Sequence, residues 1–164
     1  MTGHPHTSEP PIDVAVATRD LVYLESLTMS LARFGISVRS LTPGEAIGTE
    51  TLEGLEVMVL DTESLAPSDL EWVEAVHRDW PLVEVLTIAG EPSVAEAVRA
   101  LRTGVFTVLQ HPVADALLAE ALLAAGRRHR HARARLDALN GKRHHLDAAP
   151  GPPRGVSPRR RRSS

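Results

Sequence analysis

Short apolar runs alternate along the chain with longer segments in which apolar residues recur at every third or fourth position. The apolar runs predict five β-strands, at residues 13–17, 36–39, 55–61, 83–88 and 105–109. The segments between them predict helices, over 21–34, weakly over 42–52, from Pro67 toward Pro81, over 92–102 and from about Pro112 onward. Because crossovers between successive parallel strands are right-handed, this order predicts an α/β fold whose five-stranded parallel sheet is covered by helices on both faces.

The third apolar run, residues 55–61, is nearly continuous and ends in a carboxylate, Asp61. Continuous hydrophobicity is typical of a strand buried on both faces, so we expect this run at the centre of the sheet. Ligands of such sheets bind beyond the carboxyl ends of the strands, which makes Asp61 a candidate site residue. The neighbouring strand ends should contribute Thr18, Arg19, Asp20, Ala89 and Gly90. From this strand alone, a solvated Asp61 that merely opens the next loop is an equally good interpretation.

The last predicted helix continues past the point where the domain should end. Its seam positions keep a 4-3 spacing, at Leu118, Leu122, Ala125, His129, Ala132, Leu136 and Leu139. This heptad pattern predicts a homodimer through the last helix, or a helix that carries a signal. The alternative is a frayed basic helix with coincidental spacing, because Gly126, His129 and Ala132 make a poor seam.

Composition and charge divide the chain into four regions. We expect a disordered N-terminus over 1–11, a folded domain over 12–126, a helical extension over 127–147 and a disordered tail over 148–164, rich in Arg and Pro. Residues 1–126 carry six Arg and no Lys against 19 Asp and Glu, a net charge of −13. Residues 127–164 carry 12 Lys and Arg against two Asp, a net charge of +10. The sequence therefore predicts an acidic folded body with a basic arm.

Several protein classes are excluded by the same inventory. The chain has no cysteine, which excludes disulfides, thiolate metal sites and cysteine nucleophiles. No run of 18 apolar residues occurs and the N-terminus is polar, so we expect no membrane span, no signal peptide and a cytoplasmic location. We expect no enzyme, because no glycine-rich phosphate loop follows the first strand and no Ser-His-Asp elbow is present.

Four features of the chain, with their spacing, resemble the receiver domain of two-component response regulators, over about residues 12–126. They are Asp61 at the end of the third strand, the length of the loop that follows it, the first helix with its Gly35 stop, and the segment from Gly104 to Pro112, which is similar to the family's G-A-x-D-x-x-x-K-P. The resemblance implies a flavodoxin-like, doubly wound (βα)5 sheet with Asp61 as the phosphoacceptor. It also implies a partner, either a sensor histidine kinase or another signalling protein.

At four places the chain departs from the family pattern, and one of them is Val108, where the family has the aromatic residue that usually rotates on activation. Thr18 and Arg19 replace the two acidic residues that help to hold Mg²⁺, with Asp20 one place further on. Counting back from the glycine before the fifth strand, Ala89 stands where the family has its switch Ser or Thr. His111 replaces the phosphate-sensing Lys. The resemblance therefore implies a degenerate site.

These departures change the expected chemistry. Asp20 and Asp61 could offer Mg²⁺ at most two carboxylates, so we expect weak magnesium binding, if any. Arg19 could lie over Asp61 and pair with it as a fixed cation. His111 is either a catalytic or pH-sensing group or a solvated residue at the end of a loop, and we favour the solvated residue.

The leading hypothesis is a stand-alone, atypical receiver-like domain that signals through protein–protein contacts. The alternative is a conventional receiver that a sensor histidine kinase phosphorylates on Asp61, with Asp20 substituting for the missing acidic pair. The third and least favoured hypothesis is nucleic-acid binding by the basic arm, whose Lys and Arg could neutralise phosphates. No recognition motif follows residue 140, and the acidic body would oppose that binding.

Overall fold

The computed structural model describes residues 10–48 and 52–147. The disorder predicted for residues 1–9 and 148–164 lies outside these residues. The chain divides into two units, Met1–Arg133 and Ala134–Ser164, and each is described by itself. Pro10 and Pro11, from the predicted N-terminal tail, are described, and their carbonyls accept hydrogen bonds from Arg130.

Strands and helices follow one another in the predicted order. The strands are β1 (Ile12–Ala17), β2 (Ile36–Leu41), β3 (Val57–Thr62), β4 (Glu84–Ala89) and β5 (Thr107–Gln110). The helices are α1 (Leu21–Ala32), α3 (Pro67–Asp79), α4 (Val94–Arg102) and α5 (Asp115–Asp147). The strands pair in parallel in the order β2-β1-β3-β4-β5. This topology confirms the predicted flavodoxin-like α/β fold, with β3 in the centre and β2 at an edge.

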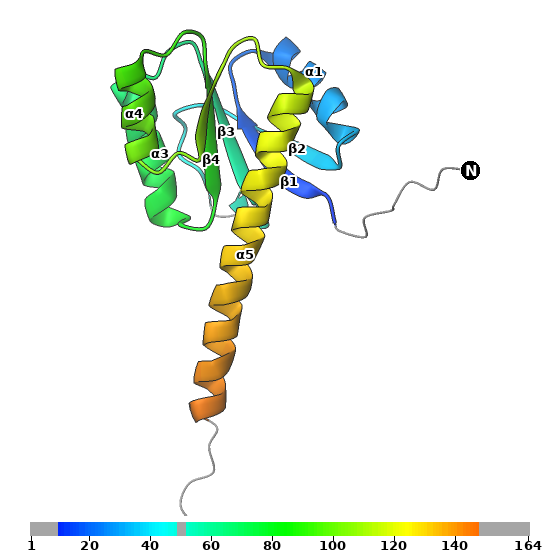
Figure 1. Ribbon diagram of the computed structural model, residues 1–164, viewed down its shortest axis with the longest axis vertical. Helices are drawn as coiled ribbons and strands as arrows, with labels where there is room; N and C mark the ends of the chain where they lie inside the picture. Colours follow the sequence, from blue (N-terminus) through cyan, green and yellow to red (C-terminus); the bar gives the residue numbers. More distant parts are fainter. Residues whose placement is uncertain (1–9, 49–51, 148–164) are drawn as a thin grey trace, which may run out of the picture. The chain divides into compact units, whose positions relative to one another are not determined.

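Helices cover both faces of the sheet (Figure 1). Because side chains alternate along a strand, β3 sends Val57 and Val59 to one face and Met58 and Leu60 to the other. The first face packs against α1 and the part of α5 that precedes residue 134. The second face packs against α3 and α4. All four side chains are buried, which explains why the central strand is an uninterrupted apolar run.

The helix predicted weakly over 42–52 is wrong for residues 42–48, which form turns and irregular backbone. Gly44 has a φ of +79°, in the left-handed region, and therefore cannot continue a right-handed helix. Residues 49–51 lie outside the described part, and Leu52 is helical. The periodicity in this segment is too weak to override the turn that the Pro43-Gly44 dipeptide favours.

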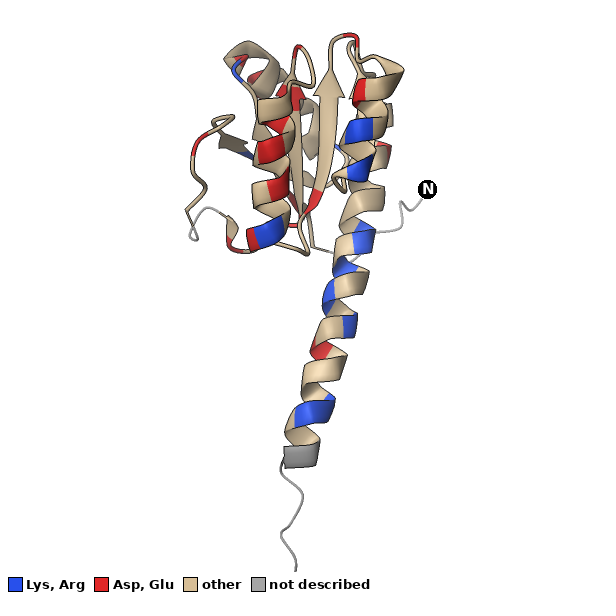
Figure 2. Ribbon diagram, turned by 90° about the vertical axis from the view of Figure 1, so that its left-hand side faces the viewer, with Lys and Arg blue, Asp and Glu red and all other residues tan. Residues whose placement is uncertain are grey.

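Helix α5 is present to Asp147, as the sequence predicts, and Figure 2 shows Lys and Arg along it. Gly126 lies in its first part, where it faces β1. A Cβ at this position would lie 2.5 Å from Cδ1 of Ile12, so a larger residue would require the side chain of Ile12 to shift. In residues 10–48 and 52–147, no helix is long and apolar enough to cross a bilayer.

Candidate functional site

A cleft of about 790 Å³ opens at the carboxyl edge of the sheet. The loops that follow β1, β3, β4 and β5 line it, as expected for parallel strands that all end at this edge. Six of the predicted site residues line the cleft: Thr18, Arg19, Asp20, Asp61, Gly90 and His111. The fold thus brings together side chains that are separated by up to 93 positions in the sequence.

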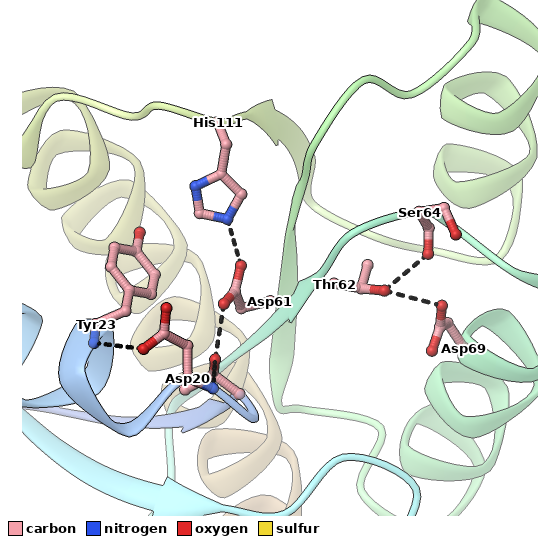
Figure 3. Close-up of polar contacts among 8 residues, drawn as sticks. Asp20, Tyr23, Asp61, Thr62, Ser64, Asp69 and His111 are labelled. Atoms are coloured by element: carbon pink, nitrogen blue, oxygen red, sulfur yellow. Dashed lines mark hydrogen bonds and ion pairs between the residues drawn. The ribbon is translucent and has the colours of Figure 1, made fainter.

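Asp61 lines this cleft and is the penultimate residue of β3, and its side chain is only 11% exposed. Both of its carboxylate oxygens are occupied by other residues of the chain (Figure 3). The hydroxyl of Thr18 donates to Oδ2 at 2.7 Å. The ring Nε2 of His111 contacts Oδ1. Asp61 is therefore not the solvated loop residue that its sequence position alone would have allowed.

Thr18 is fixed in this role by its own backbone surroundings. Its side chain is buried at the end of β1, and its hydroxyl oxygen accepts the backbone N–H of Asp20 at 3.0 Å. A hydroxyl group has one proton to donate, and here that proton is directed to Asp61. Thr18 is thus a hydrogen-bond donor to the carboxylate of Asp61.

His111 follows β5, and its backbone N–H donates to the carbonyl of Ala89 at 2.8 Å. Because an ionised carboxylate can only accept hydrogen bonds, the contact with Asp61 requires a proton on Nε2. On the other side the imidazole meets the ring of Tyr23 edge-to-face, with ring centroids 5.3 Å apart and an interplanar angle of 67°. The interpretation of His111 as a solvated loop residue is wrong, because both sides of its ring are in contact with other residues.

Tyr23 is a site residue that the sequence analysis missed. It lies in the first turn of α1 and lines the cleft. Its hydroxyl is buried and finds no hydrogen-bond partner among the described residues. Burial raises the pKa of Tyr23 to about 12, and the negative charges of Asp61, Asp115 and Asp20 add to the increase. The signal available in the sequence was its position three residues after the helix-capping Asp20.

Arg19 and Asp20, the other two residues of the loop after β1, make no hydrogen bond or ion pair with Asp61. Arg19 is exposed, and it does not pair with Asp61, whose oxygens are held by Thr18 and His111. The reason is alternation at the strand end, since Thr18 faces inward and its neighbour must face outward. Asp20 caps α1, with Oδ1 accepting the backbone N–H of Tyr23 at 2.9 Å.

The arrangement of the acidic residues does not fit a magnesium site. Both oxygens of Asp61 already have partners, and one oxygen of Asp20 serves the helix cap. Nowhere in the described part of the chain do three or more His, Cys, Asp or Glu side chains form a group that could hold a metal ion. Mg²⁺ at Asp61 would have to share a carboxylate oxygen with Thr18 or His111.

Ala89 is buried at the end of β4 and does not line the cleft, contrary to its prediction as a site-lining residue. Its register partner in β3 is Thr62, whereas Thr87 lies opposite Leu60, further from the strand end. The neighbouring Gly90 does reach the cleft. Its N–H donates to the carbonyl of Glu63 at 3.1 Å, and a Cβ at this position would lie 2.8 Å from the same oxygen.

A second polar cluster fixes the loop between β3 and α3. The hydroxyl of Thr62 lies 2.7 Å from the carbonyl of Ser64 and 3.2 Å from Oδ2 of Asp69 (Figure 3). Asp69 also accepts the backbone N–H of Ala66 at 3.0 Å, near the start of α3. The loop that follows Asp61 is therefore held by its own hydrogen bonds.

The sequence matches no protein family model and no curated protein. Solved structures do match it. A response regulator receiver domain protein from Clostridium thermocellum superposes with a TM-score of 0.63 at 21% identity, covering 71% of this chain and 95% of its own. The chain has the fold of a receiver domain.

Other solved structures place the chain on the same receiver fold. A CheY-like receiver domain protein from Methanospirillum hungatei matches with a TM-score of 0.60 at 18% identity, over 74% of this chain and 98% of its own. A response regulator from Thermotoga maritima matches with a TM-score of 0.58 at 11% identity, over 71% of this chain and 98% of its own. The resemblance seen in the sequence is thus confirmed at the level of the receiver fold, and Asp61 is the penultimate residue of the central strand of this fold.

Proposed function

We propose that this protein is a non-catalytic signalling module of the two-component type, an atypical receiver that acts through protein–protein contacts. The receiver fold supports the class of function. The observation that carries the proposal is the pairing of both Asp61 oxygens with Thr18 and His111. In this protein the chain itself provides partners for both oxygens of the carboxylate that a conventional receiver would offer to a phosphoryl group.

The chemistry of phosphoryl transfer explains why this pairing matters. An oxygen of Asp61 would have to attack phosphorus while the bond to the leaving group breaks, and cations must absorb the charge on the phosphoryl oxygens. The contacts of Thr18 and His111 draw electron density from both carboxylate oxygens and so lower their nucleophilicity, and Thr18 stands where an acid would help to bind a metal. Asp61 is therefore expected to be a poor acceptor.

The test is the intact mass of the protein after incubation with acetyl phosphate and Mg²⁺. We expect no phosphoryl adduct, in a reaction where a conventional receiver domain gives one. A double variant, Thr18→Asp with His111→Lys, restores the two family residues next to Asp61. We expect it to gain one adduct, which adding Asp61→Asn removes. Circular dichroism shows that each variant is folded.

A second candidate function is that of a conventional phosphoacceptor, phosphorylated by a sensor histidine kinase. The open cleft beside Asp61 favours it, because a phosphoryl group could enter from solvent. In that case the unmodified protein itself gains one adduct, and Asp61→Asn abolishes it. That outcome would contradict the atypical receiver and would mean that Thr18 and His111 move away from Asp61 during the reaction.

A further inference from the structure

Within the unit Met1–Arg133, the first part of α5 shows how this helix uses its seam. Leu118, Leu122 and Ala125 are buried against the sheet in the predicted 4-3 spacing. Basic side chains next to this seam pair with carboxylates of the surface that the helix covers. Arg128 lies 3.2 Å from Glu84, and Arg130 lies 2.6 Å from Glu56. The pattern is an apolar seam with basic borders that meets an apolar surface with acidic borders.

The unit that begins at Ala134 continues the seam and the basic border that starts at Arg128, with exposed side chains, whereas Asp137 stands seven positions after Arg130. Leu136 and Leu139 continue the seam and are 43% and 60% exposed. All side chains described in this unit, up to residue 145, are exposed. Arg135 and Lys142 lie seven positions apart and therefore border the seam on the same side. The segment thus has an apolar seam and a basic border, as the first part of α5 does.

A second copy of the chain is a poor match for this seam. The 4-3 spacing makes Arg143 the next seam position after Leu139. A parallel pair would place Arg143 against the same residue of the other copy, and a charged seam residue costs stability. An antiparallel pair would bring Arg135 and Lys142 together with their counterparts across the border, and like charges repel. The homodimer through the last helix is therefore disfavoured by charge in either orientation.

We propose that residues 134–147 of α5 bind an acidic amphipathic helix of another protein. The apolar face of that helix would cover Leu136 and Leu139, and its carboxylates would pair with Arg135, Lys142 and Arg143. The pair of Arg128 with Glu84 in the first unit is the precedent for such contacts, because Arg135 and Lys142 follow Arg128 at intervals of seven residues. This inference rests on the proposed signalling function, since it states the chemistry of the partner.

The experiment uses the full chain and a fluorescently labelled synthetic peptide helix. The peptide carries Leu at its seam positions and Glu at the bordering positions, and a matched peptide carries Lys instead of Glu. Fluorescence anisotropy gives the two dissociation constants. We expect the Glu peptide to bind at least about tenfold more tightly than the Lys peptide, and salt to weaken its binding, because the selectivity is electrostatic.

Variants of exposed residues test the assignment without disturbing the core. Leu136→Ser with Leu139→Ser should abolish binding of the Glu peptide. Arg135→Glu with Lys142→Glu should reverse the preference to the Lys peptide. The matched control is Leu117→Ser, an exposed leucine of the same helix in the first unit, which should leave binding unchanged.

Several outcomes would overturn the proposal. They are the absence of Glu-peptide binding, an effect of Leu117→Ser equal to that of the Leu136 and Leu139 pair, and a dimer in sedimentation equilibrium that the Leu136 and Leu139 pair dissolves. Tighter binding to duplex DNA or to vesicles containing phosphatidylserine, lost in the same pair variant, would instead assign the seam to nucleic acid or lipid. None of these outcomes changes the mass measurement at Asp61, so the two proposals fail separately.

Discussion

Glu56 and Asp61 are carboxylates at opposite ends of the central strand, and the chain binds both of them. Their side chains are 13% and 11% exposed, so burial hardly distinguishes them. Glu56 receives Nε and Nη2 of Arg130 at 2.6 and 3.2 Å and the backbone N–H of Asp13 at 3.0 Å. Asp61 receives one hydroxyl and one imidazole.

The partners make the difference between the two ends. Arg130 is charged at every physiological pH and binds Glu56 with two nitrogens, while its Nη2 also reaches the carbonyl of Pro10 at 3.0 Å. This network joins α5, β3 and the start of β1. Thr18 and His111 each hold Asp61 by a single contact, beside an open cleft. Several contacts from a charged side chain and the backbone hold Glu56, whereas two single contacts beside a cleft hold Asp61.

The largest effect on stability is expected at Glu56. Glu56→Gln should lower the free energy of unfolding by about 2 kcal/mol, because it leaves the charge of Arg130 without its carboxylate. Urea denaturation measures the loss. The matched control is Glu84→Gln, whose partner Arg128 is 65% exposed, and its effect should stay below about 0.5 kcal/mol. Equal losses in the two variants would contradict the special role of Glu56.

A smaller effect is expected at Asp61. Asp61→Asn should change the free energy of unfolding by less than about 1 kcal/mol, because the amide oxygen can still accept a hydrogen bond from Thr18 or His111. The same urea titration measures it. A loss as large as that of Glu56→Gln would mean that Asp61 is a structural carboxylate, and the comparison between the two ends would then collapse.

The smallest effect is spectroscopic and concerns Tyr23, the only tyrosine of the chain. Its raised pKa means that the native fold favours the neutral phenol, so this contribution to stability is complete below pH 10 and is lost as the pH rises toward about 12. The ultraviolet absorbance of tyrosinate should titrate near pH 12. In Asp61→Asn the pKa should fall, because one of the charges that raise it is gone. An unchanged pKa would contradict a close approach of Tyr23 to Asp61.

The sequence was a good guide to the fold because packing follows its periodicity. The continuous run before Asp61 could only be a central strand, and parallel strands must bring their carboxyl ends to one edge. The turn at Gly44 was predicted as a helix, because a weak helical periodicity was given more weight than the turn signal of Pro43-Gly44. Gly126 looked like a flaw in the heptad seam, but its contact with Ile12 lies outside any pattern within the helix.

The site was harder to predict because its contacts depend on directions that the sequence does not state. The strand ends gave the right residues, yet Thr18 rather than Arg19 faces Asp61. His111 looked like a loop-end residue because its partners, Asp61 and Tyr23, are 50 and 88 positions away. Residue type and spacing thus located the edge of the sheet, and side-chain orientation decided which groups meet there.

The hydrogen bond between Gly90 and Glu63 joins the loop after β4 to the loop after β3, on the rim of the cleft. It joins main chain to main chain, so no exchange of side chains in the Asp61 loop can loosen it. Because Gly90 leads into α4, a shift of the loop after Asp61 would also move the backbone that leads into α4. Any event at Asp61 that moves its loop is therefore coupled through the backbone to α4, which packs on the same face of the sheet as α3, and a Cβ at Gly90 would clash with the carbonyl of Glu63.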